Sequence, residues 1–333
     1  MDLAGKKVVV VGGAGFIGSH VVDELLKTDV REVVIYDNFF RGSHDNLRQA
    51  MTDKRVSIFP HGGDVLHRDI LEKAIEGADG VFHLAALWIL QCHEYPETAF
   101  DVNIRGTFNV AMACIKHKVQ RVVYSSSASV YGDAVRIPMD EDHPYNNFTF
   151  YGASKIAGEH TFKSLGHRYG LEWCGLRYMN VYGPRQDYKG AYTAVMHKIL
   201  DRIGSGEQPV VFGDGSQQYD FVHVQDVARA NVLAMQASAS GHCYNVGRGI
   251  GTTIKDLSEL LLKLSGSRQT IKYEPAGTTF VTNRIGCPKL AERDLGFRWT
   301  IGLEDGMQSL IDWRRADSAA LDAKRVAGGG VRR

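Results

Sequence analysis

The feature that most constrains the fold is an alternation of short apolar runs with segments of helical periodicity over the first half of the chain. The runs are rich in Val, Ile and aromatic residues, and they include "KVVVVGG", "EVVIYD", "GVFHLAA", "RVVYSSS" and "EWCGLRY". Strands that alternate with helices pair in parallel and are covered by helices on both faces. The alternation therefore predicts an α/β fold of Rossmann type, with a doubly wound parallel sheet.

The texture of the sequence changes after Tyr178, where Gly, Pro and aromatic residues separate shorter elements. "HCYNVG" is typical of one more buried strand, and "TIKDLSELLLKLSG" of an amphipathic helix that ends at Gly266. This half predicts a smaller α/β substrate-binding region. The predicted domains are a Rossmann domain over 1–178 with a returning strand near 226–248, a substrate region over 179–225 and 249–320, and a flexible tail over 321–333.

Composition excludes several classes of function. The chain has 333 residues, 44% of them hydrophobic, and a formal net charge of +1, so it favours a folded protein with no basic footprint for nucleic acid. Its five cysteines form no C-x-x-C pair, which favours reduced thiols and a cytoplasmic location. We expect no membrane span, because no apolar stretch is long enough. We also expect no metal site, because the histidines form no H-x-x-x-H pair.

A glycine-rich turn follows the first predicted strand. "VVVVGGAGFIGSH" places Gly12, Gly15 and Gly18 between a strand and a helix, where they allow a tight turn and bring the backbone close to a pyrophosphate at the helix N-terminus. Asp37 ends the next strand, where a carboxylate accepts the ribose hydroxyls of NAD and repels a 2′-phosphate. The pair predicts NAD binding. Arg41 would weaken this preference, and a plain turn with a capping Asp is the alternative.

"FYGASKIAGEH" contains a candidate catalytic pair. Tyr151 and Lys155 are four residues apart in a helix-compatible segment, and so they lie on one face. A tyrosine has a pKa of about 10, so a base near neutral pH needs a shift of roughly three units, or about 4 kcal/mol. A lysine ammonium and the positive nicotinamide ring supply a field of that kind. The same spacing also arises by chance.

Five motifs together carry a family resemblance: "GGAGFIGSH", "YSSSASVYGD", "YGASK", "LRYMNVYGPRQ" and "DFVHVQDVARA". In this order and over nearly the whole chain they resemble the extended short-chain dehydrogenase/reductases, in the nucleotide-sugar epimerase/dehydratase branch that includes the UDP-galactose 4-epimerases. The set is specific, whereas the glycine motif alone is not.

The resemblance implies a catalytic set of Ser127, Tyr151 and Lys155. Tyr151 would act as the base, Ser127 would bond the sugar oxygen, and Lys155 would hold the cofactor ribose and the charge of the phenol. The other serines of "YSSSASVYGD" would be local: Ser125 and Ser126 would line the cofactor floor, and Ser129 would bond nearby backbone.

The resemblance also implies cofactor and substrate contacts. The cofactor residues would be Gly12, Gly15, Phe16, Ile17, Gly18, Asp37, Asn38, Asp64, Val65, Leu84, Ala85, Ala86, Asn103, Ser125, Tyr151, Lys155 and Tyr178. The substrate residues would be Trp88, Ser127, Asn180, Arg185, Phe212, Tyr219 and Arg284. Plainer roles remain open, with Asp64 as a cap, Asn103 as a helix start and Phe212 as core.

Two positions depart from the family pattern. Trp88 stands near the place where galactose epimerases have a lysine, and Tyr219 stands where many relatives have an arginine that clamps the diphosphate. A phenol cannot donate a bidentate charged fork, so another cation is needed. Arg185 and Arg284 are the candidates, and at Arg284 a cation would also favour a uronate.

The resemblance implies a reaction with a nucleotide sugar of the UDP-linked kind. Dehydratases of the family carry an Asp-Glu pair after the catalytic hydroxyl, and decarboxylases often carry a Glu two residues after it, whereas this chain has Ala128 and Ser129. This favours a 4-epimerase of the UDP-glucose type. A dehydratase, a UDP-uronate epimerase or decarboxylase, a reductase that releases NADH and a non-catalytic NAD-binding sensor remain alternatives. A homodimer is expected through the helical segments Val102 to Lys116 and Gly152 to His167.

Overall fold

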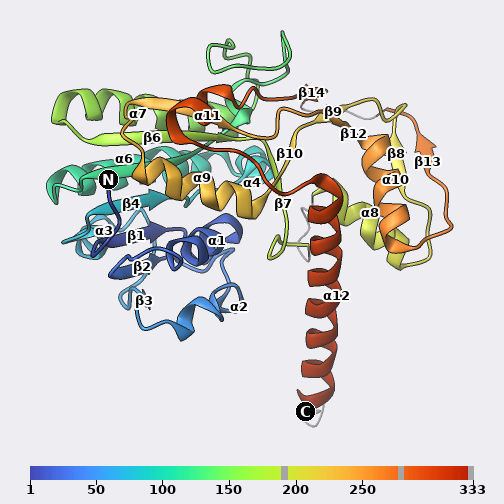
Figure 1. Ribbon diagram of the computed structural model, residues 1–333, viewed down its shortest axis with the longest axis horizontal. Helices are drawn as coiled ribbons and strands as arrows, with labels where there is room; N and C mark the ends of the chain where they lie inside the picture. Colours follow the sequence, from blue (N-terminus) through green and yellow to red (C-terminus); the bar gives the residue numbers. More distant parts are fainter. Residues whose placement is uncertain (189–193, 277–280, 329–333) are drawn as a thin grey trace.

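The core of the molecule is a seven-stranded parallel sheet (Figure 1). The computed structural model describes residues 1–188, 194–276 and 281–328, with side chains to Ala319. The strand order is β11-β6-β5-β4-β1-β2-β3, so the chain winds outward from β1 in both directions and the doubly wound prediction is confirmed. The strands are β1 (Lys7–Val11), β2 (Glu32–Tyr36), β3 (Val56–Ile58), β4 (Gly80–His83), β5 (Arg121–Ser127), β6 (Glu172–Tyr178) and β11 (His242–Val246).

Helices cover both faces of this sheet. In β1, Val8 and Val10 pack into one hydrophobic cluster and Val9 and Val11 into another, as the two-residue period of a strand requires. The first cluster lies under α1 (Phe16–Leu25) and α9 (Val224–Gln236), which pack on each other. The second lies under α3 (Arg68–Ile75), α6 (Gly106–Lys116) and α7 (Phe150–Tyr169).

Shorter elements connect these layers. They are α2 (His44–Leu47), η1 (Ala50–Thr52), α4 (Ile89–Glu94), α5 (Pro96–Ala99), the π-helical segment η2 (Phe100–Arg105), η3 (Ala128–Val130) and α11 (Lys289–Leu295). The long helix α7 has well-defined ends. Thr149 caps its first turn by accepting the N–H of Gly152, and Gly170 ends it in the left-handed conformation at φ 74°.

A smaller unit lies to the right of the sheet in Figure 1 and has its own hydrophobic cluster. Its helices are α8 (Val195–Gly204), α10 (Ile254–Ser265) and α12 (Leu303–Gly328). Its strands are β7 (Asn180–Tyr182), β8 (Val210–Phe212), β9 (Gln218–Tyr219), β10 (Phe221–His223), β12 (Thr252–Thr253), β13 (Lys272–Glu274) and β14 (Asn283–Arg284), which pair as β10-β7, β12-β9-β14 and β13-β8.

The chain returns to the main sheet within the segment 226–248, first as α9 and then as β11. Helix α12 projects from the body of the molecule and runs to Gly328, into the segment 321–333 that the sequence predicts as a tail. Residues 329–333 of that segment lie outside the described residues.

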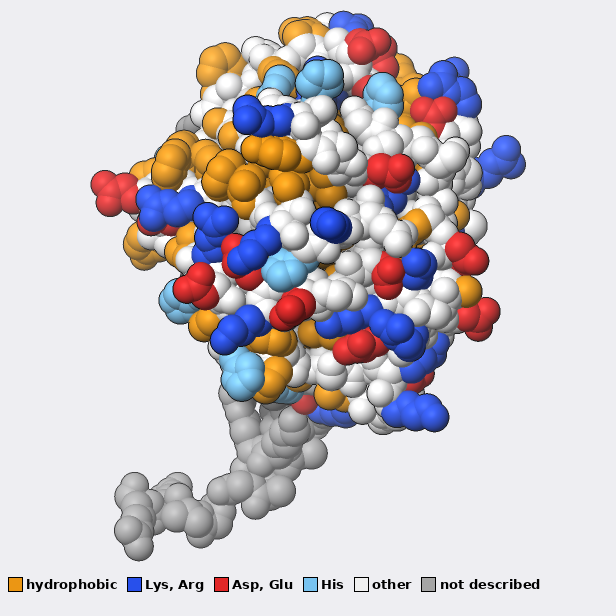
Figure 2. Space-filling view, turned by 90° about the vertical axis from the view of Figure 1, so that its left-hand side faces the viewer, with side chains coloured by type: hydrophobic (Ala, Val, Ile, Leu, Met, Phe, Trp, Pro, Cys, Tyr) orange, Lys and Arg blue, Asp and Glu red, His pale blue; other side chains and the backbone are white. Residues whose placement is uncertain are grey.

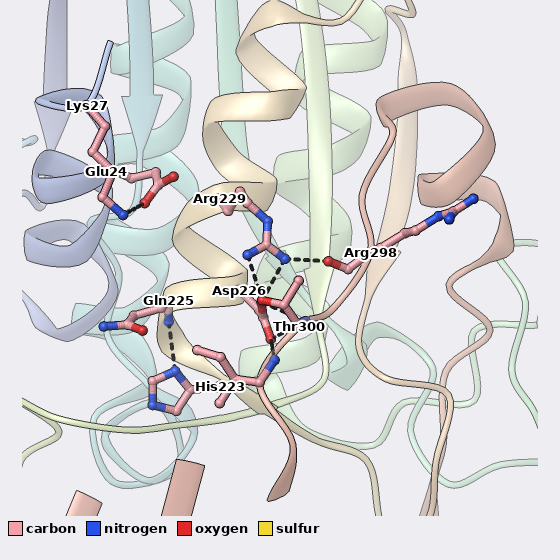
Figure 3. Close-up of polar contacts among 9 residues, drawn as sticks. Glu24, Lys27, His223, Gln225, Asp226, Arg229, Arg298 and Thr300 are labelled. Carbon is pink, nitrogen blue, oxygen red and sulfur yellow. Dashed lines mark hydrogen bonds and ion pairs between the residues drawn. The ribbon is translucent and has the colours of Figure 1, made fainter. Parts of the chain in front are cut away.

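The connection that leads to α12 is fastened to α9 by one buried carboxylate (Figure 3). Asp226 accepts hydrogen bonds from the backbone N–H groups of Thr300 and Ile301 and from the Thr300 hydroxyl. It also pairs with Arg229 at 2.7 Å. The smaller unit is therefore held to the sheet layer by several bonds to a side chain that is fully buried.

The five cysteines are all free. Within the described ranges, no group of three or more His, Cys, Asp or Glu side chains is arranged to hold a metal ion. No helix in those ranges combines the length and apolarity that crossing a bilayer requires. Figure 2, seen from the left-hand side of Figure 1, shows hydrophobic side chains gathered in the upper part of that face and charges of both signs spread below them.

Candidate active site

The glycine turn between β1 and α1 leaves no room for a side chain at Gly12 or Gly18. A Cβ at Gly12, where φ is +85°, would lie 2.6 Å from the backbone N of Ala85, and a Cβ at Gly18 would lie 2.1 Å from the carbonyl oxygen of Gly12. Gly15 is the N-cap of α1 and supplies no side-chain cap. The backbone of the turn and the first residues of α1, Phe16 and Ile17, thus form a close-packed cradle. Such a cradle fits a pyrophosphate.

Asp37 lies beside this turn, at the end of β2. Its carboxylate accepts hydrogen bonds from the N–H groups of Ala14 and Phe39, each at 2.8 Å. Burial raises the pKa of Asp37, and these bonds oppose the rise. The carboxylate is thereby fixed where a dinucleotide ribose lies in this fold, and Asn38 follows it in the chain.

Arg41, which would have weakened the preference for NAD, is engaged elsewhere. Its guanidinium lies 4.7 Å from the centroid of the Trp88 ring and pairs with Asp187 at 3.3 Å. It therefore stacks on the predicted sugar-pocket tryptophan and is bound to a carboxylate, whereas Asp37 bonds the glycine turn directly through the N–H of Ala14.

The segment after β4 runs alongside the glycine turn. Leu84 and Ala85 both donate their N–H groups to the carbonyl oxygen of Val11, and Ala86 follows them. Asn103 holds the continuation of this segment, because its side chain accepts the N–H of Leu87 at 2.7 Å and donates to the Leu87 carbonyl.

Asn103, Asp64 and Val65, all predicted cofactor residues, have contacts within the protein. The same Asn103 amide donates to the Ser154 hydroxyl at 3.1 Å and so joins this segment to α7. Asp64 accepts the N–H of Leu66 at 2.9 Å, which is a turn cap, and Val65 is buried in the second hydrophobic cluster. Asp64 therefore acts as a cap, which is the alternative that the sequence left open for it. Asn103 has a structural role, because it connects this segment to α7.

Ser127, Tyr151 and Lys155 come together where β5 meets α7. The Lys155 ammonium donates to the carbonyl oxygen of Ser125 at 2.7 Å and lies 5.6 Å from the centroid of the Tyr151 ring. Lys155 is 4% exposed. The i, i+4 spacing thus places the phenol and the ammonium on one face of α7, directed toward the end of β5.

Burial dominates the electrostatics of this cluster. It lowers the pKa of Lys155 to about 8, and it raises the pKa of Tyr151 to about 12, against a hydrogen bond with Ser127 and the charge of Arg284. The chain alone therefore opposes ionisation of the phenol. A positive cofactor ring beside it would shift this balance toward the phenolate.

The serines of "YSSSASVYGD" have separate partners. Ser125 bonds the hydroxyl of Tyr178 at 2.9 Å, whereas Ser126 donates to Glu159 on the other side of the strand. The expectation that Ser126 lines the cofactor floor with Ser125 is therefore wrong, because adjacent residues of a strand face opposite sides. The hydroxyl of Ser129 meets Arg284 rather than nearby backbone, at 3.5 Å from its Nη1.

Two polar residues near the cluster, Asn231 and Cys92, were not found from the sequence. Tyr178, which would border the nicotinamide, donates to Asn231 on α9 at 2.9 Å, so it links Ser125 to a second helix. Cys92 is fully buried near Tyr151, and its proximity raises the pKa of Lys155 against the effect of burial. No local motif marks Asn231 or Cys92, since both reach the site only through tertiary packing.

The buried pair Glu159 and Arg177 was also missed. Glu159 Oε1 and Oε2 accept bonds from Nε and Nη2 of Arg177 at 2.9 and 2.8 Å. Glu159 lies one helical turn after Lys155, and this second i, i+4 step was the available signal.

The predicted substrate residues fall into two groups. Arg284 and Tyr219 are partners in the register of the parallel strands β14 and β9, and Arg284 contacts the Ser129 hydroxyl at 3.5 Å. The Tyr219 hydroxyl donates to the Val281 carbonyl at 2.7 Å. Arg185, by contrast, pairs with Asp23 on α1 at 2.7 Å.

Asn180 and Phe212 complete the predicted set. The side-chain amide of Asn180 makes only a long contact of 3.5 Å with the Asp220 carbonyl. Phe212, on β8, is 56% exposed, so it is not a core residue. Both side chains are thus available on the smaller unit.

A doubly wound sheet with a glycine cradle at α1, an aspartate after β2 and a Ser, Tyr and Lys cluster between β5 and α7 defines a dinucleotide-binding enzyme of the short-chain dehydrogenase/reductase type. The comparisons with known proteins agree. The model of the NAD dependent epimerase/dehydratase family matches residues 8–247, and the chain belongs to this family. Its cofactor is NAD, as the sequence predicts.

Among curated proteins, the chain is 34% identical over 311 residues to a putative UDP-glucose 4-epimerase of Methanocaldococcus jannaschii, covering 92% of this chain and 98% of that one. Among solved structures, it is similar to a UDP-N-acetylglucosamine 4-epimerase from Methanobrevibacter ruminantium in complex with UDP-N-acetylmuramic acid, with a TM-score of 0.88, 32% identity and coverage of 94% and 99%. It is also similar to a UDP-glucose 4-epimerase from Thermotoga maritima with UDP-glucose, with a TM-score of 0.86, 32% identity and coverage of 93% and 99%. The prediction of an NAD-dependent enzyme of the epimerase type is confirmed.

Proposed function

We propose that the protein is a nucleotide-sugar 4-epimerase of the UDP-glucose type, which oxidises C4 of the sugar transiently and returns hydride to the opposite face. One observation carries the proposal. The Tyr151 phenol bonds the Ser127 hydroxyl, and its ring centroid lies 5.6 Å from the buried ammonium of Lys155, with no carboxylate supplied by the two residues after Ser127.

In this proposal Tyr151 takes the proton of the C4 hydroxyl and later returns it. Bound NAD⁺ supplies the hydride acceptor and donor at C4. Ser127 holds the C4 oxygen, and Lys155 stabilises the phenolate through its positive charge. The glycine turn, Asp37 and the segment 84–86 orient the dinucleotide, while Asn180 and the smaller unit hold the nucleotide sugar. The keto-sugar must rotate within the site and present its opposite face before hydride returns.

The residues at 128 and 129 separate this reaction from the alternatives. Removal of water from a keto-sugar needs an additional acid and base, and neither Ala128 nor the hydroxyl of Ser129 is one at neutral pH. Ala128 is buried, and Ser129 is engaged with Arg284. This supports simple oxidation and return over dehydration or decarboxylation.

The test is direct. The purified protein is incubated with UDP-glucose, UDP-N-acetylglucosamine, UDP-glucuronate and their dTDP and GDP counterparts, and the configuration at C4 is followed by proton NMR. We expect inversion at C4 for at least one UDP-sugar without added NADH. Loss of water or carbon dioxide in place of inversion would assign the protein to the dehydratase or decarboxylase alternative.

The same experiment addresses the alternatives of another class. A non-catalytic sensor would show no absorbance of reduced cofactor when nucleotide sugars are added, and a reductase would consume NADH in proportion to product. An epimerase differs from both: its bound cofactor is reduced while the keto-sugar is present, but it consumes no added NADH, because the cofactor is restored in each turnover.

Assembly, domains and location are part of the proposal. We propose a homodimer through α6 and α7, supported by Phe100 and Phe108, which are 47% and 44% exposed on η2 and α6. Residues 1–178 would form the cofactor domain, 179–225 and 249–320 the substrate region, and the protein would be cytoplasmic. Light scattering tests the dimer, and Phe108→Asp is expected to give monomers.

A further inference from the structure

A guanidinium lies beside the candidate base without an acidic partner. Nη1 of Arg284 is 3.5 Å from the Ser129 hydroxyl, and its Nε is buried with no hydrogen-bond partner among the described residues. No carboxylate in the described ranges forms an ion pair with it. Asp133 is the acidic group whose charge acts on Arg284, but its oxygens accept bonds from Thr282 and Asn283.

The direction of the Arg284 side chain is set by the backbone around it. Asp133 accepts the N–H groups of Thr282 and Asn283 at 3.0 and 3.1 Å, and β14 pairs with β9 on its other side. Directly after Arg284, the carbonyl of Ile285 accepts the N–H of Met139 at 2.8 Å. The backbone that carries Arg284 is therefore fixed on both sides, and the guanidinium is directed to the Ser129 hydroxyl.

Arg284 as a whole is half-buried, but its Nε is enclosed without a partner and its charge has no counter-charge among the described residues. An enclosed cationic donor without a partner costs free energy, so its position points to a ligand that supplies the anion. The proposed substrate class offers two anions, the diphosphate on C1 and, in acidic sugars, a carboxylate on C5. C5 is bonded to C4, the carbon whose hydroxyl faces Tyr151, whereas C1 lies across the ring. Arg284 contacts Ser129, which follows the candidate catalytic Ser127 by two residues, and this placement favours the C5 position.

We propose that Arg284 and the Ser129 hydroxyl bind a carboxylate on the sugar, and that the preferred substrates are nucleotide-linked hexuronates. The planar guanidinium donates to both carboxylate oxygens, and Ser129 donates a further bond. This inference rests on the proposed function, because the sugar is placed by the reaction at C4. It names the substrate class of that same site.

The test measures binding apart from turnover. In a Tyr151→Phe background, calorimetric titrations compare UDP-glucuronate, UDP-glucose and UDP. We expect UDP-glucuronate to bind at least about tenfold more tightly than UDP-glucose, as a charge-assisted hydrogen bond implies. Arg284→Gln in the same background removes this preference and leaves the dissociation constants for UDP-glucose and UDP within about threefold. Arg284→Lys retains part of the preference.

Lys289→Gln is the matched control, since it removes one positive charge from an exposed position five residues away and leaves all three affinities unchanged. Equal weakening of all three ligands by Arg284→Gln would assign the arginine to the diphosphate and overturn the proposal. Equal affinity of the starting protein for UDP-glucuronate and UDP-glucose would overturn it as well.

Failure of the proposed function gives a different result. Oxidation of a uronate at C4 yields a β-keto acid, which can lose carbon dioxide. Preference for UDP-glucuronate together with release of carbon dioxide, or with no reaction, supports the Arg284 contact and removes the epimerase assignment alone.

Discussion

Two buried cations near α7 have opposite environments. The Lys155 ammonium donates to a neutral carbonyl, that of Ser125, and burial lowers its pKa to about 8. Burial would also lower the pKa of Arg177, but the two hydrogen bonds that it donates to Glu159 hold this pKa above the ordinary value. The Lys155 ammonium thus bonds a carbonyl, whereas the Arg177 guanidinium is paired with the Glu159 carboxylate.

The difference separates a reactive cluster from a structural one. A charge that lacks a protein counter-charge can act on a ligand or on a neighbouring phenol, because its field is not cancelled. A paired charge fixes geometry, here by joining α7 to β6, and its loss destabilises the fold. Arg284 resembles Lys155 in this respect, and both lie beside Tyr151.

The largest expected effect tests the unpaired cluster. Tyr151→Phe should lower kcat by about 10²- to 10⁴-fold, because it removes the general base. It should change the free energy of unfolding by only about 1 kcal/mol, since the phenol bonds only Ser127. Turnover is measured by NMR and stability by urea unfolding. Tyr145→Phe is the matched control, since its hydroxyl bonds Glu159 and Arg177 in the paired cluster and kcat should be unchanged. Full activity in Tyr151→Phe would end the assignment.

The next effect tests the paired cluster. Glu159→Ala should destabilise the protein by about 3 to 5 kcal/mol, because it leaves the Arg177 charge buried and uncompensated. The double variant Glu159→Leu with Arg177→Leu should recover most of this loss, because no buried charge then remains. Urea unfolding of the wild type, the single variant and the double variant measures both values. Equal instability of the single and double variants would show that packing, rather than charge, accounts for the loss.

The same contrast explains which parts could be predicted from the sequence. Tyr151 and Lys155, the glycine turn and the strand that ends before Asp37 are encoded by local periodicity and spacing, so the sheet and the reactive cluster were predictable. The partners Glu159 and Arg177 are eighteen positions apart and meet only because α7 packs on β6.

The two arginines proposed to bind the substrate, Arg185 and Arg284, also show that the sequence alone does not reveal tertiary contacts. The sequence offered Arg185 and Arg284 as equal candidates for an anionic ligand. The fold distinguishes them, because Arg185 pairs with Asp23 on α1 while Arg284 reaches the Ser129 hydroxyl. Such a choice depends on contacts between distant segments, which local patterns do not encode.

A smaller effect is expected in the pH dependence of stability. The folded pKa of Lys155 is about 8, below its ordinary value of 10.5, so between these values the unfolded state binds more protons and stability rises with pH. The pKa of Glu159 is lowered, against burial, by its bonds to Arg177, so its contribution is present above the ordinary pKa of 4.5 and is lost on acidification.

Lys155→Met isolates the first slope from other groups that titrate in the same range. The stability of the wild type relative to this variant should rise by about 1 to 3 kcal/mol between pH 7.5 and 10, measured by urea unfolding at both values. A difference that stays constant with pH would mean that Lys155 is charged as readily in the folded protein as in water.

The smallest effect asks whether a buried carboxylate needs a cation at all. Asp226 is fully buried like Glu159, but it also accepts the N–H groups of Thr300 and Ile301, and its cationic partner Arg229 is 30% exposed (Figure 3). Arg229→Ala should therefore cost only about 1 kcal/mol in unfolding free energy, because backbone donors remain and a solvated partner contributes little. A cost near that of Glu159→Ala would mean that N–H donors do not replace a guanidinium. By the same reasoning, the Ser125 carbonyl, which accepts the Lys155 ammonium, would then stabilise that charge less than a carboxylate would.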